Sequence, residues 1–418
     1  MRKLFAVAVS ATLVGFVACS SSTRSAGDRD GGVGPEAGVF GSDAVADSPF
    51  TGCARGTYAA KVTPAAMLFV LDKSGTMAQG GKFASAQQAI VTAADEPTFD
   101  SMVVGLLGYP TLSVSGPACI FGLPVLCGVT GLPQVPLRLA GASKSNGGPG
   151  VRRDMYAWLS SNAPQPGFGD GNPTYEALKS GINALKVYNL NKGKRILVYI
   201  TAGGASCASV SSPSRPGYTD GNSCPDWEHP QSIVDLLKAA HDDAEKPVNS
   251  MIVGVPGADT HGENTNVPPY SVRLALSAYA ATGSPETIDP TCDGKAFTKV
   301  NTDPGKACHF DMTRNFSPEI LAGAIGQVRG KLLGCVFDLP EVDGKIVDRD
   351  KVNVDYTIKD APIHIYKRKS PSDTCAADGC WDYTADGRVE LLGKACEDVK
   401  TSTSAKVEIV VGCQTIVK

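Results

Sequence analysis

The stretch that decides the fold reads Met67-Leu68-Phe69-Val70-Leu71-Asp72-Lys73-Ser74-Gly75-Thr76, a continuous apolar run that ends in a polar turn. A short apolar run bounded by turn residues is typical of a strand that is buried on both faces of a sheet. Three more runs of this kind follow along the chain, at Met102–Leu107, Ile196–Ile200 and Met251–Val255. The sequence therefore predicts at least four buried strands.

Helical patterns alternate with these strands. Apolar residues recur with a period near 3.6 in one segment after each of the first three strands, at residues 83–94, 175–185 and 233–240. A fourth helix is expected to begin at Ser317 and Pro318, which suit the N-cap and the first helical position. Its expected buried positions are Ile320, Leu321, Ala324, Ile325, Val328 and Leu332. This alternation predicts an α/β fold with a doubly wound, mostly parallel sheet flanked by helices.

The composition disfavours several classes of protein. The chain has 418 residues, with 39 basic and 42 acidic side chains and a formal net charge of −3. This balance gives no electrostatic footprint for nucleic acid, so no nucleic-acid partner is expected. After the N-terminus, no apolar stretch reaches the roughly 18 residues that a membrane-spanning helix needs. A nucleic-acid binder and a multi-span membrane protein are therefore poor interpretations.

The first 18 residues have the form of a secretory signal peptide, with a charged start and an apolar run too short to span a membrane. The run ends in Gly15-Phe16-Val17-Ala18-Cys19-Ser20, which resembles the lipobox of bacterial lipoproteins, with Phe16 where that family usually has Leu. The resemblance implies lipidation of Cys19 and a lipid anchor in the cell envelope, and Ser20 favours the outer membrane. The alternative is an ordinary signal peptide with an incidental Cys19. Residues 19–51, rich in Ser, Gly, Ala and Asp, are expected to be a flexible tether.

The cysteine count also favours export. Apart from Cys19 the chain has twelve cysteines, an even set that suits an oxidising compartment. Spacing predicts four local disulfides, which are Cys119–Cys127, Cys207–Cys224, Cys292–Cys308 and Cys375–Cys380. Cys53 and Cys335 flank the predicted α/β domain, whose ends should lie close together, so we expect them to pair. Cys396 would then pair with Cys413, because these are the two cysteines that remain. A zinc site is disfavoured, because the Cys and His residues are scattered and have no zinc-site spacing.

The pattern changes after Cys335. Apolar and polar residues alternate in three later segments, which turn residues separate and which show no helical pattern. These segments are 352–358, 363–365 and 407–411. We expect residues 336–418 to form a small antiparallel β domain held by disulfides, and residues 52–335 to form the α/β domain. Within the latter, the insertion between residues 109 and 150 is expected to form an edge hairpin.

Polar side chains follow the first strand at its carboxyl end. Asp72, Ser74 and Thr76 place one carboxylate and two hydroxyls on alternate residues of a turn. Thr174 adds another hydroxyl where the loop Asp170-Gly171-Asn172-Pro173-Thr174 enters a helix. In open α/β sheets, ligands bind beyond the carboxyl ends of the strands, where the strand order reverses. Converging oxygens suit a hard cation such as Mg²⁺, so these four side chains are the candidate metal ligands.

This arrangement resembles the von Willebrand factor type A (VWA) domain and its metal-ion-dependent adhesion site. The family's first motif, Asp-x-Ser-x-Ser, is matched by Asp72, Ser74 and Thr76, and its second, a threonine before a helix, by Thr174. Its third motif, usually Thr-Asp-Gly, corresponds to Thr201-Ala202-Gly203, so a methyl group replaces a carboxylate. The resemblance covers residues from about 60 to 334. It implies a bound Mg²⁺, Ca²⁺ or Mn²⁺ ion. The loss of a carboxylate would lower the affinity of the site for that ion.

Ala202 leaves three interpretations open. In the first, an acidic side chain of a partner completes the coordination, so that metal and partner bind together. In the second, Asp170 or Asp220 supplies a more distant negative charge. In the third, the site holds no ion, and the hydroxyl groups merely cap turns.

The resemblance implies a cell-envelope lipoprotein whose VWA domain binds a protein or a surface polymer. One alternative is an envelope hydrolase, but the sequence lacks His-Glu-x-x-His and Gly-x-Ser-x-Gly motifs, so we expect no enzyme. Another is a structural calcium-binding protein, since one turn region is acidic. Its residues are Asp343, Asp348, Asp350 and Asn353. Their spacing fits no EF-hand loop, which favours a solvated turn.

Overall fold

The computed structural model describes most of the chain after residue 55. The described residues are 56–59, 61–62, 65–113, 119–120, 123–124, 127–164, 171–190, 193–205, 218–219, 225–260, 270–294, 303–332, 335–342, 345–358, 361–385, 387–401 and 406–417. The predicted signal peptide, the lipidation of Cys19 and the predicted tether lie outside these residues. In the described part, no helix has the length and apolar character needed to cross a membrane.

A six-stranded sheet forms the centre of residues 65–332, which we call the α/β region. Its strand order is β14–β13–β10–β3–β4–β9, and only β9 runs antiparallel to its neighbour. The strands are β3 (Ala66–Asp72), β4 (Val103–Tyr109), β9 (Val135–Leu139), β10 (Arg195–Thr201), β13 (Val248–Gly254) and β14 (Phe310–Asp311). This arrangement confirms the predicted α/β fold with a mostly parallel sheet.

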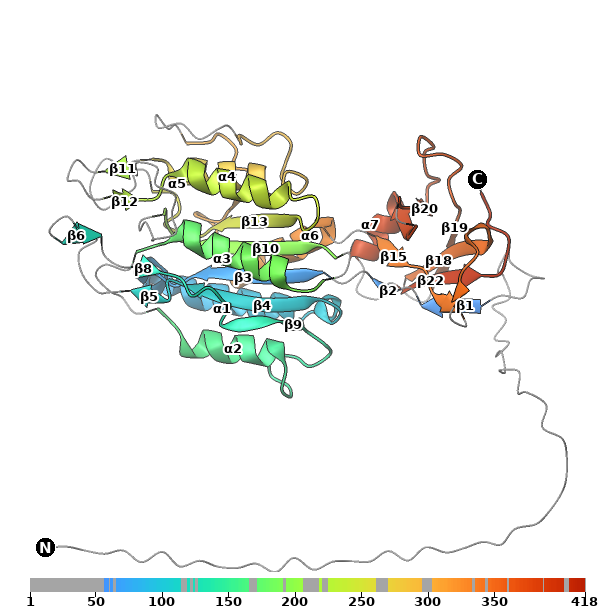
Figure 1. The fold of residues 1–418 in the computed structure, drawn as a ribbon, viewed down its shortest axis with the longest axis horizontal. Coiled ribbons are helices and arrows are strands. Elements are labelled where there is room, and N and C mark those ends of the chain that lie inside the picture. Colours follow the sequence, from blue (N-terminus) through green and yellow to red (C-terminus); the bar gives the residue numbers. More distant parts are fainter. Residues whose placement is uncertain are drawn as a thin grey trace, which may run out of the picture. The chain divides into compact units, whose positions relative to one another are not determined.

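Six helices cover the two faces of this sheet (Figure 1). On one face lie α1 (Lys82–Ala94), α2 (Val151–Ser161) and α6 (Pro318–Leu332). On the other lie α3 (Thr174–Val187), α4 (Pro230–His241) and α5 (Val272–Gly283). Alternate residues of β3 divide between the two cores, as the pleat of a strand requires, with Phe69 in the first and Leu68 in the second.

Helix α3 approaches the sheet closely because it carries a glycine. A Cβ atom built on Gly181 would lie 2.9 Å from Cγ2 of Val70, so a larger residue would push the helix away. This close packing fixes the height of α3 over β3. It therefore fixes the position of Thr174, the first residue of α3, relative to the carboxyl end of that strand.

Several elements of the α/β region differ from the prediction. Helices α2 and α5 and the edge strands β9 and β14 were not expected as separate elements. Ile320, expected to be buried, is 39% exposed. In the insertion where an edge hairpin was expected, the structure has the edge strand β9 and two nested antiparallel pairs. These are β5 (Leu112–Ser113) with β8 (Cys127–Gly128), and β6 (Cys119–Ile120) with β7 (Leu123–Pro124).

Two four-stranded antiparallel sheets make up what we call the β region, residues 56–62 and 336–417. The first sheet contains β1 (Gly56–Ala59), β22 (Lys406–Val411), β18 (Val352–Ile358) and β19 (Ala361–Ile365). The second contains β2 (Lys61–Val62), β15 (Val336–Asp338), β21 (Val389–Leu392) and β20 (Cys380–Tyr383). The alternating segments thus form the strands that the sequence predicts.

The β region corrects two expectations. Helix α7 (Lys394–Thr401) lies within it, although the sequence showed no helical pattern there. Strands β1 and β2 pair with β22 and β15, so residues 56–62 do not belong to the α/β domain that was predicted to begin at residue 52. The α/β region is therefore inserted in sequence between the first two and the remaining strands of the β region.

The disulfides agree with the prediction in part. Cys292–Cys308 and Cys375–Cys380 are bonded as expected. Cys335, however, bonds Cys396, which corrects both Cys53–Cys335 and Cys396–Cys413. A contact between distant parts of the chain explains this bond. Leu391 donates its N–H to the carbonyl of Cys335, which places the start of β15 beside the segment that leads into α7. The expected bonds Cys119–Cys127 and Cys207–Cys224 involve side chains outside the described part.

A remaining disulfide is expected between Cys53 and Cys413. Cys413 is disulfide-bonded, and it follows Val411, which pairs with Gly56 in antiparallel register. Cys53 precedes Gly56 by three positions in the sequence, and an antiparallel register continued beyond β1 would bring it close to Cys413. Peptide mapping of the unreduced protein by mass spectrometry should yield a linked peptide pair containing both. A peptide with Cys53 joined to any other cysteine would contradict the assignment.

Candidate functional site

The candidate site lies where the strand order of the sheet reverses. After β3 the chain adds β4 on one side, and it later adds β10 on the other side of β3. Such a reversal opens a crevice at the carboxyl ends of the two central strands, which is where ligands bind in open α/β sheets. The residues at these ends are Asp72 of β3 and Thr201 of β10.

Asp72 is fully buried and accepts hydrogen bonds from four protein groups. Its Oδ2 accepts from the Thr201 hydroxyl at 2.8 Å, from Nδ2 of Asn172 at 2.9 Å and from the backbone N–H of Ala202 at 3.3 Å. Its Oδ1 accepts from the backbone N–H of Ser74 at 2.8 Å. Burial raises the pKa of Asp72, and these hydrogen bonds oppose that rise. A carboxylate has about four lone-pair positions, so these donors occupy most of its capacity.

Ser74 and Thr76 bring their hydroxyl groups together, as expected from their spacing. The two oxygens lie 2.9 Å apart, with Ser74 buried and Thr76 exposed. This separation suits a hydrogen bond, and it also suits neighbouring corners of a Mg²⁺ octahedron, which lie about 3 Å apart. Thr76 is thus the accessible member of a hydroxyl pair at the end of β3.

Thr174 belongs to a different part of the network. Its hydroxyl donates to Oδ1 of Asn172 at 2.9 Å and lies 2.9 Å from the Tyr199 hydroxyl, which accepts from the Tyr109 hydroxyl at 2.8 Å. Asn172 then links Thr174 to Asp72. The structure therefore brings Thr174 to the same sheet edge as Asp72, but its hydroxyl is engaged with Asn172 and Tyr199.

The residues present do not fit a divalent cation as they stand. Protein donors occupy most of the acceptor capacity of Asp72, Thr174 is engaged elsewhere, and a buried methyl group stands at Ala202. Among the described residues, no three His, Cys, Asp or Glu side chains gather closely enough to hold a metal ion. Asp170 and Asp220, the residues suggested as sources of a more distant charge, lie outside those residues. The metal assignment of Asp72, Ser74, Thr76 and Thr174 stays a prediction.

Sequence reasoning missed three residues that organise this site. Thr201 precedes Ala202 at the end of an apolar strand, and Asn172 lies two residues before Thr174, so both stood next to the motifs. Lys82 gave no such signal, because its main contact is the carbonyl of Pro256, far away in the sequence. A polar residue at the end of a buried strand is a usable signal, whereas a long-range lysine contact is not.

The acidic turn in the β region has a structural explanation. Asp348 caps the short helix Arg349–Lys351 by accepting from the backbone N–H of Asp350 at 3.1 Å. It also forms an ion pair with Lys351 at 3.4 Å. Asn353 donates to the carbonyls of Cys413 and Gln414, and Asp343 lies outside the described part. Helix capping and strand contacts thus engage the side chains of Asp348 and Asn353.

Comparisons with known proteins show distant similarity. No protein-family profile and no curated protein matches the sequence. Among solved structures, the chain is similar to the pilus adhesin SpaC from Lactobacillus rhamnosus GG, with 14% identity, a TM-score of 0.39, and coverage of 84% of this chain and 39% of that chain. It is also similar to the SpRpn10 VWA domain, with 12% identity, a TM-score of 0.31, and coverage of 64% and 95%. For the minor pilin PilB from Streptococcus sanguinis, the identity is 13% and the TM-score is 0.34. The match covers 65% of this chain and 62% of that chain.

These likenesses are too weak to carry a functional argument. The chain spans 39% of the length of SpaC, so much of that protein has no counterpart in the match. The description of the candidate site therefore rests on its own geometry. That geometry is a buried carboxylate under a pair of hydroxyl groups, at the carboxyl edge of a parallel sheet.

Proposed function

We propose that this protein is a binding module of the cell envelope, and that it holds a protein or surface-polymer partner at the carboxyl edge of its parallel sheet. The observation that carries the proposal is the position of the Ser74 and Thr76 hydroxyls at the point of strand reversal. Buried hydrogen bonds to Asp72 hold the turn that bears them, so the binding edge is rigid before a partner arrives. Preorganisation of this kind reduces the entropy that binding costs.

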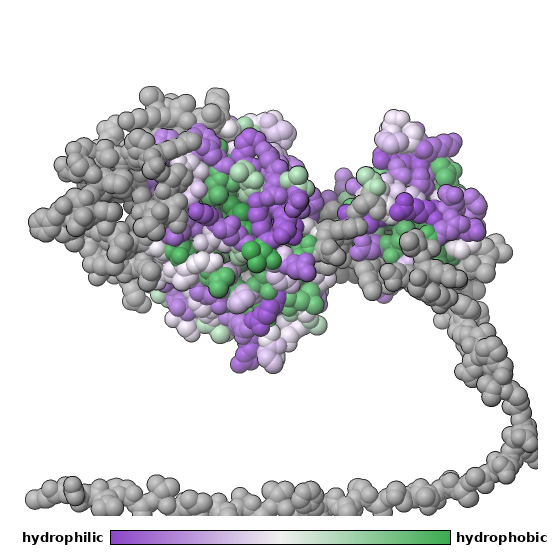
Figure 2. All heavy atoms as spheres, in the orientation of Figure 1, coloured by the Kyte–Doolittle hydropathy of each residue, from purple (hydrophilic) through white to green (hydrophobic). Residues whose placement is uncertain are grey.

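The surface supports recognition through polar groups. On the face shown in Figure 2, hydrophilic residues are widespread and hydrophobic ones are interspersed among them. Thr76 is exposed, and Asp259 is exposed in the turn that follows β13. We therefore propose a partner that offers hydrogen-bonding or charged groups. The proposal includes no catalytic step.

The proposed location follows from the N-terminal sequence. The run that ends in Ala18-Cys19-Ser20 supports a lipid anchor on Cys19, with the tether 19–51 joining it to the folded part. Anchoring of this kind would hold the module at the outer membrane while leaving its binding edge accessible. A mass shift that matches acyl chains on an N-terminal Cys19 peptide would test this location.

The binding role is tested by capturing partners from envelope extracts on the immobilised protein. Replacing Ser74 by alanine together with Thr76 by valine is expected to lower the amount of retained partner at least fivefold. Thr291→Val, at an exposed threonine whose hydroxyl donates to Asp289, is the matched control and should retain it. Equal retention by both variants would refute the proposed binding edge.

A chelator added to the same capture separates two forms of the proposal. Loss of the partner in EDTA would show that a divalent cation takes part. This result is expected if an acidic side chain of the partner completes the coordination of the ion. Retention in EDTA would keep the binding role and remove the ion. The two results thus decide between a metal-dependent and a metal-independent contact without changing the protein.

A further inference from the structure

Lys82 stands at an unusual place beside the candidate site. It is the first residue of α1, where the positive end of the helix dipole disfavours a cation. Gly80 and Gly81 precede it with φ of 62° and 70°, a left-handed conformation that glycine adopts freely. The chain therefore turns sharply from the Ser74–Thr76 turn into a helix that begins with a lysine.

The Lys82 side chain reaches from this helix to the loops that follow β10 and β13. Its Nζ donates to the carbonyl of Pro256 at 2.9 Å. A Cβ atom built on Gly257 would lie 3.4 Å from this Nζ and 2.7 Å from the carbonyl oxygen of Ala202. The ammonium group is thus held next to the backbone of the position where the resemblance expects the third motif's carboxylate.

Two carboxylates act on this ammonium group. The negative charges of Asp72 and Asp259 both favour the charged form of Lys82, while partial burial lowers its pKa. Asp72 itself accepts four hydrogen bonds, which is the pattern of an ionised carboxylate. Positive charge in its surroundings stabilises a buried carboxylate, and the charge of Lys82 attracts Asp72.

From this geometry we propose that the Lys82 ammonium group is the resident cation of the site and makes it independent of divalent metal ions. A divalent ion is balanced by two carboxylates, whereas a monovalent ammonium group is balanced by one. The chain has Ala202 where a second carboxylate would stand, and it has Lys82 next to that position. Asp72, Asp259 and Lys82 together carry one negative charge, so an added divalent ion would leave a net positive charge in a partly buried place, which is unfavourable.

The test is a titration of Mn²⁺ into the purified full-length protein, followed by electron paramagnetic resonance and calorimetry. The wild type is expected to bind no Mn²⁺ at concentrations up to about 1 mM, and EDTA should leave its unfolding curve unchanged. Ala202→Asp is expected to bind Mn²⁺ weakly, because Lys82 still repels the ion. The double variant Ala202→Asp with Lys82→Met is expected to bind at least tenfold more tightly than Ala202→Asp.

Two further variants control this titration. Lys73→Met removes a positive charge from the residue next to Asp72, and combined with Ala202→Asp it should change Mn²⁺ affinity much less than Lys82→Met does. Lys82→Gln removes the charge but keeps a hydrogen-bond donor on the side chain, so it is the second variant in case Lys82→Met does not fold. Urea unfolding of each variant verifies that the compared proteins are folded.

Three outcomes would overturn the proposal. One is Mn²⁺ binding by the wild type below about 1 mM. Another is equal affinity of Ala202→Asp and the double variant, since Lys82 would then not exclude the ion. The third is no uptake by either double variant, with Lys82→Met or Lys82→Gln, because a restored carboxylate and a removed ammonium group should together admit Mn²⁺. The titration needs no partner, so its failure is distinguishable from a failed capture experiment.

Discussion

Replacing Arg152 by methionine is expected to lower the free energy of unfolding by about 3 kcal/mol. Arg152 is the second residue of α2, and its side chain is fully buried. One of its guanidinium nitrogens donates to the carbonyl of Gly141 at 2.8 Å, and another donates to Oδ1 of Asp100 at 2.8 Å. Removing the arginine leaves the carbonyl and the carboxylate without these donors, and methionine fills the space without replacing them.

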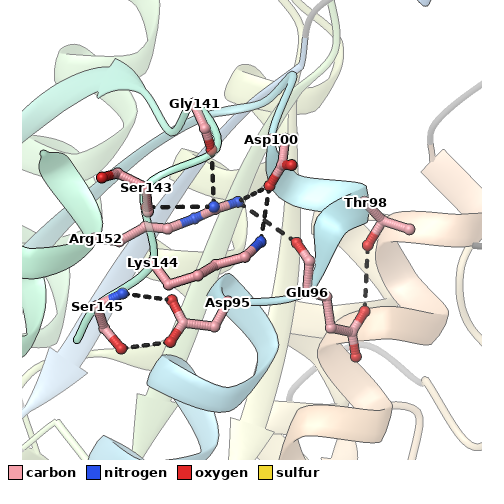
Figure 3. Close-up of polar contacts among 9 residues, drawn as sticks. All are labelled: Asp95, Glu96, Thr98, Asp100, Gly141, Ser143, Lys144, Ser145 and Arg152. Carbon is pink, nitrogen blue, oxygen red and sulfur yellow. Dashed lines mark hydrogen bonds and ion pairs between the residues drawn. The ribbon is translucent and has the colours of Figure 1, made fainter. Parts of the chain in front are cut away.

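The surrounding contacts explain why the loss should be large but not maximal. Figure 3 shows Arg152 pointing from α2 toward Asp100 and the 141–145 loop, with Lys144 also reaching Asp100. Lys144 would remain 3.0 Å from Asp100 in the variant, and the Asp100 side chain is 38% exposed. Part of its charge would therefore stay compensated by Lys144 and by water.

Arg138→Met is the matched control for this prediction. Arg138 pairs with Asp154, but both side chains are 50% exposed. Ion pairs of this kind contribute about 0–1 kcal/mol, so the control should unfold almost like the wild type. Urea unfolding at neutral pH measures both variants. A loss under about 1 kcal/mol for Arg152→Met would show that the buried network does not stabilise the fold.

Stability is expected to fall between pH 6.5 and 4 because His309 stays neutral in the folded protein. Burial lowers the pKa of His309 to about 4, although Asp311 opposes this shift, and Arg273 adds to it. Among the residues that the structure describes, neither ring nitrogen has a hydrogen-bond partner. In the unfolded chain the imidazole takes up a proton near pH 6.5, whereas the folded protein does so only near pH 4. Between these values the unfolded state binds more protons, so acid favours unfolding by up to about 3 kcal/mol.

His309→Asn isolates this effect from the carboxylates that titrate in the same range. Unfolding free energies of both proteins are measured by urea at intervals from pH 7.5 to 3.5. The wild-type curve should fall more steeply than the variant curve between pH 6.5 and 4, and the two should run parallel above and below that window. Parallel curves across the whole range would mean that the buried imidazole does not couple folding to pH.

Much of the α/β fold was predictable because its strands are short, continuous apolar runs and four helices have clear periodicity. Helix α5 was missed for the opposite reason: apolar residues and buried small residues cover most of its surface, so the sequence shows no contrast between faces. Helix α2 was missed because it buries Arg152, a residue type that a sequence pattern assigns to the surface. Both failures come from packing between elements, which local periodicity does not contain.

The candidate site was predictable to a similar extent. Asp72, Ser74 and Thr76 are close in the sequence, so one turn brings them together. Thr174 was expected among the same oxygens, but Asn172 and Tyr199 engage its hydroxyl, and only the folded chain brings these groups together. The bond between Cys335 and Cys396 was missed for a related reason, since it depends on a helix that the sequence did not reveal.

The pairing of β1 with β22 imposes an order on folding as the proposed exported chain emerges from the translocation channel. Gly56 emerges long before its partner Val411. The α/β region lies between Gly56 and Val411 in the sequence, so it can fold before β1 has a partner strand. Until β22 arrives, β1 is an unpaired strand edge, which is prone to association with other chains. A chain that stops before residue 406 would therefore carry a complete parallel sheet together with an open edge, and such products are natural targets for chaperones and proteases.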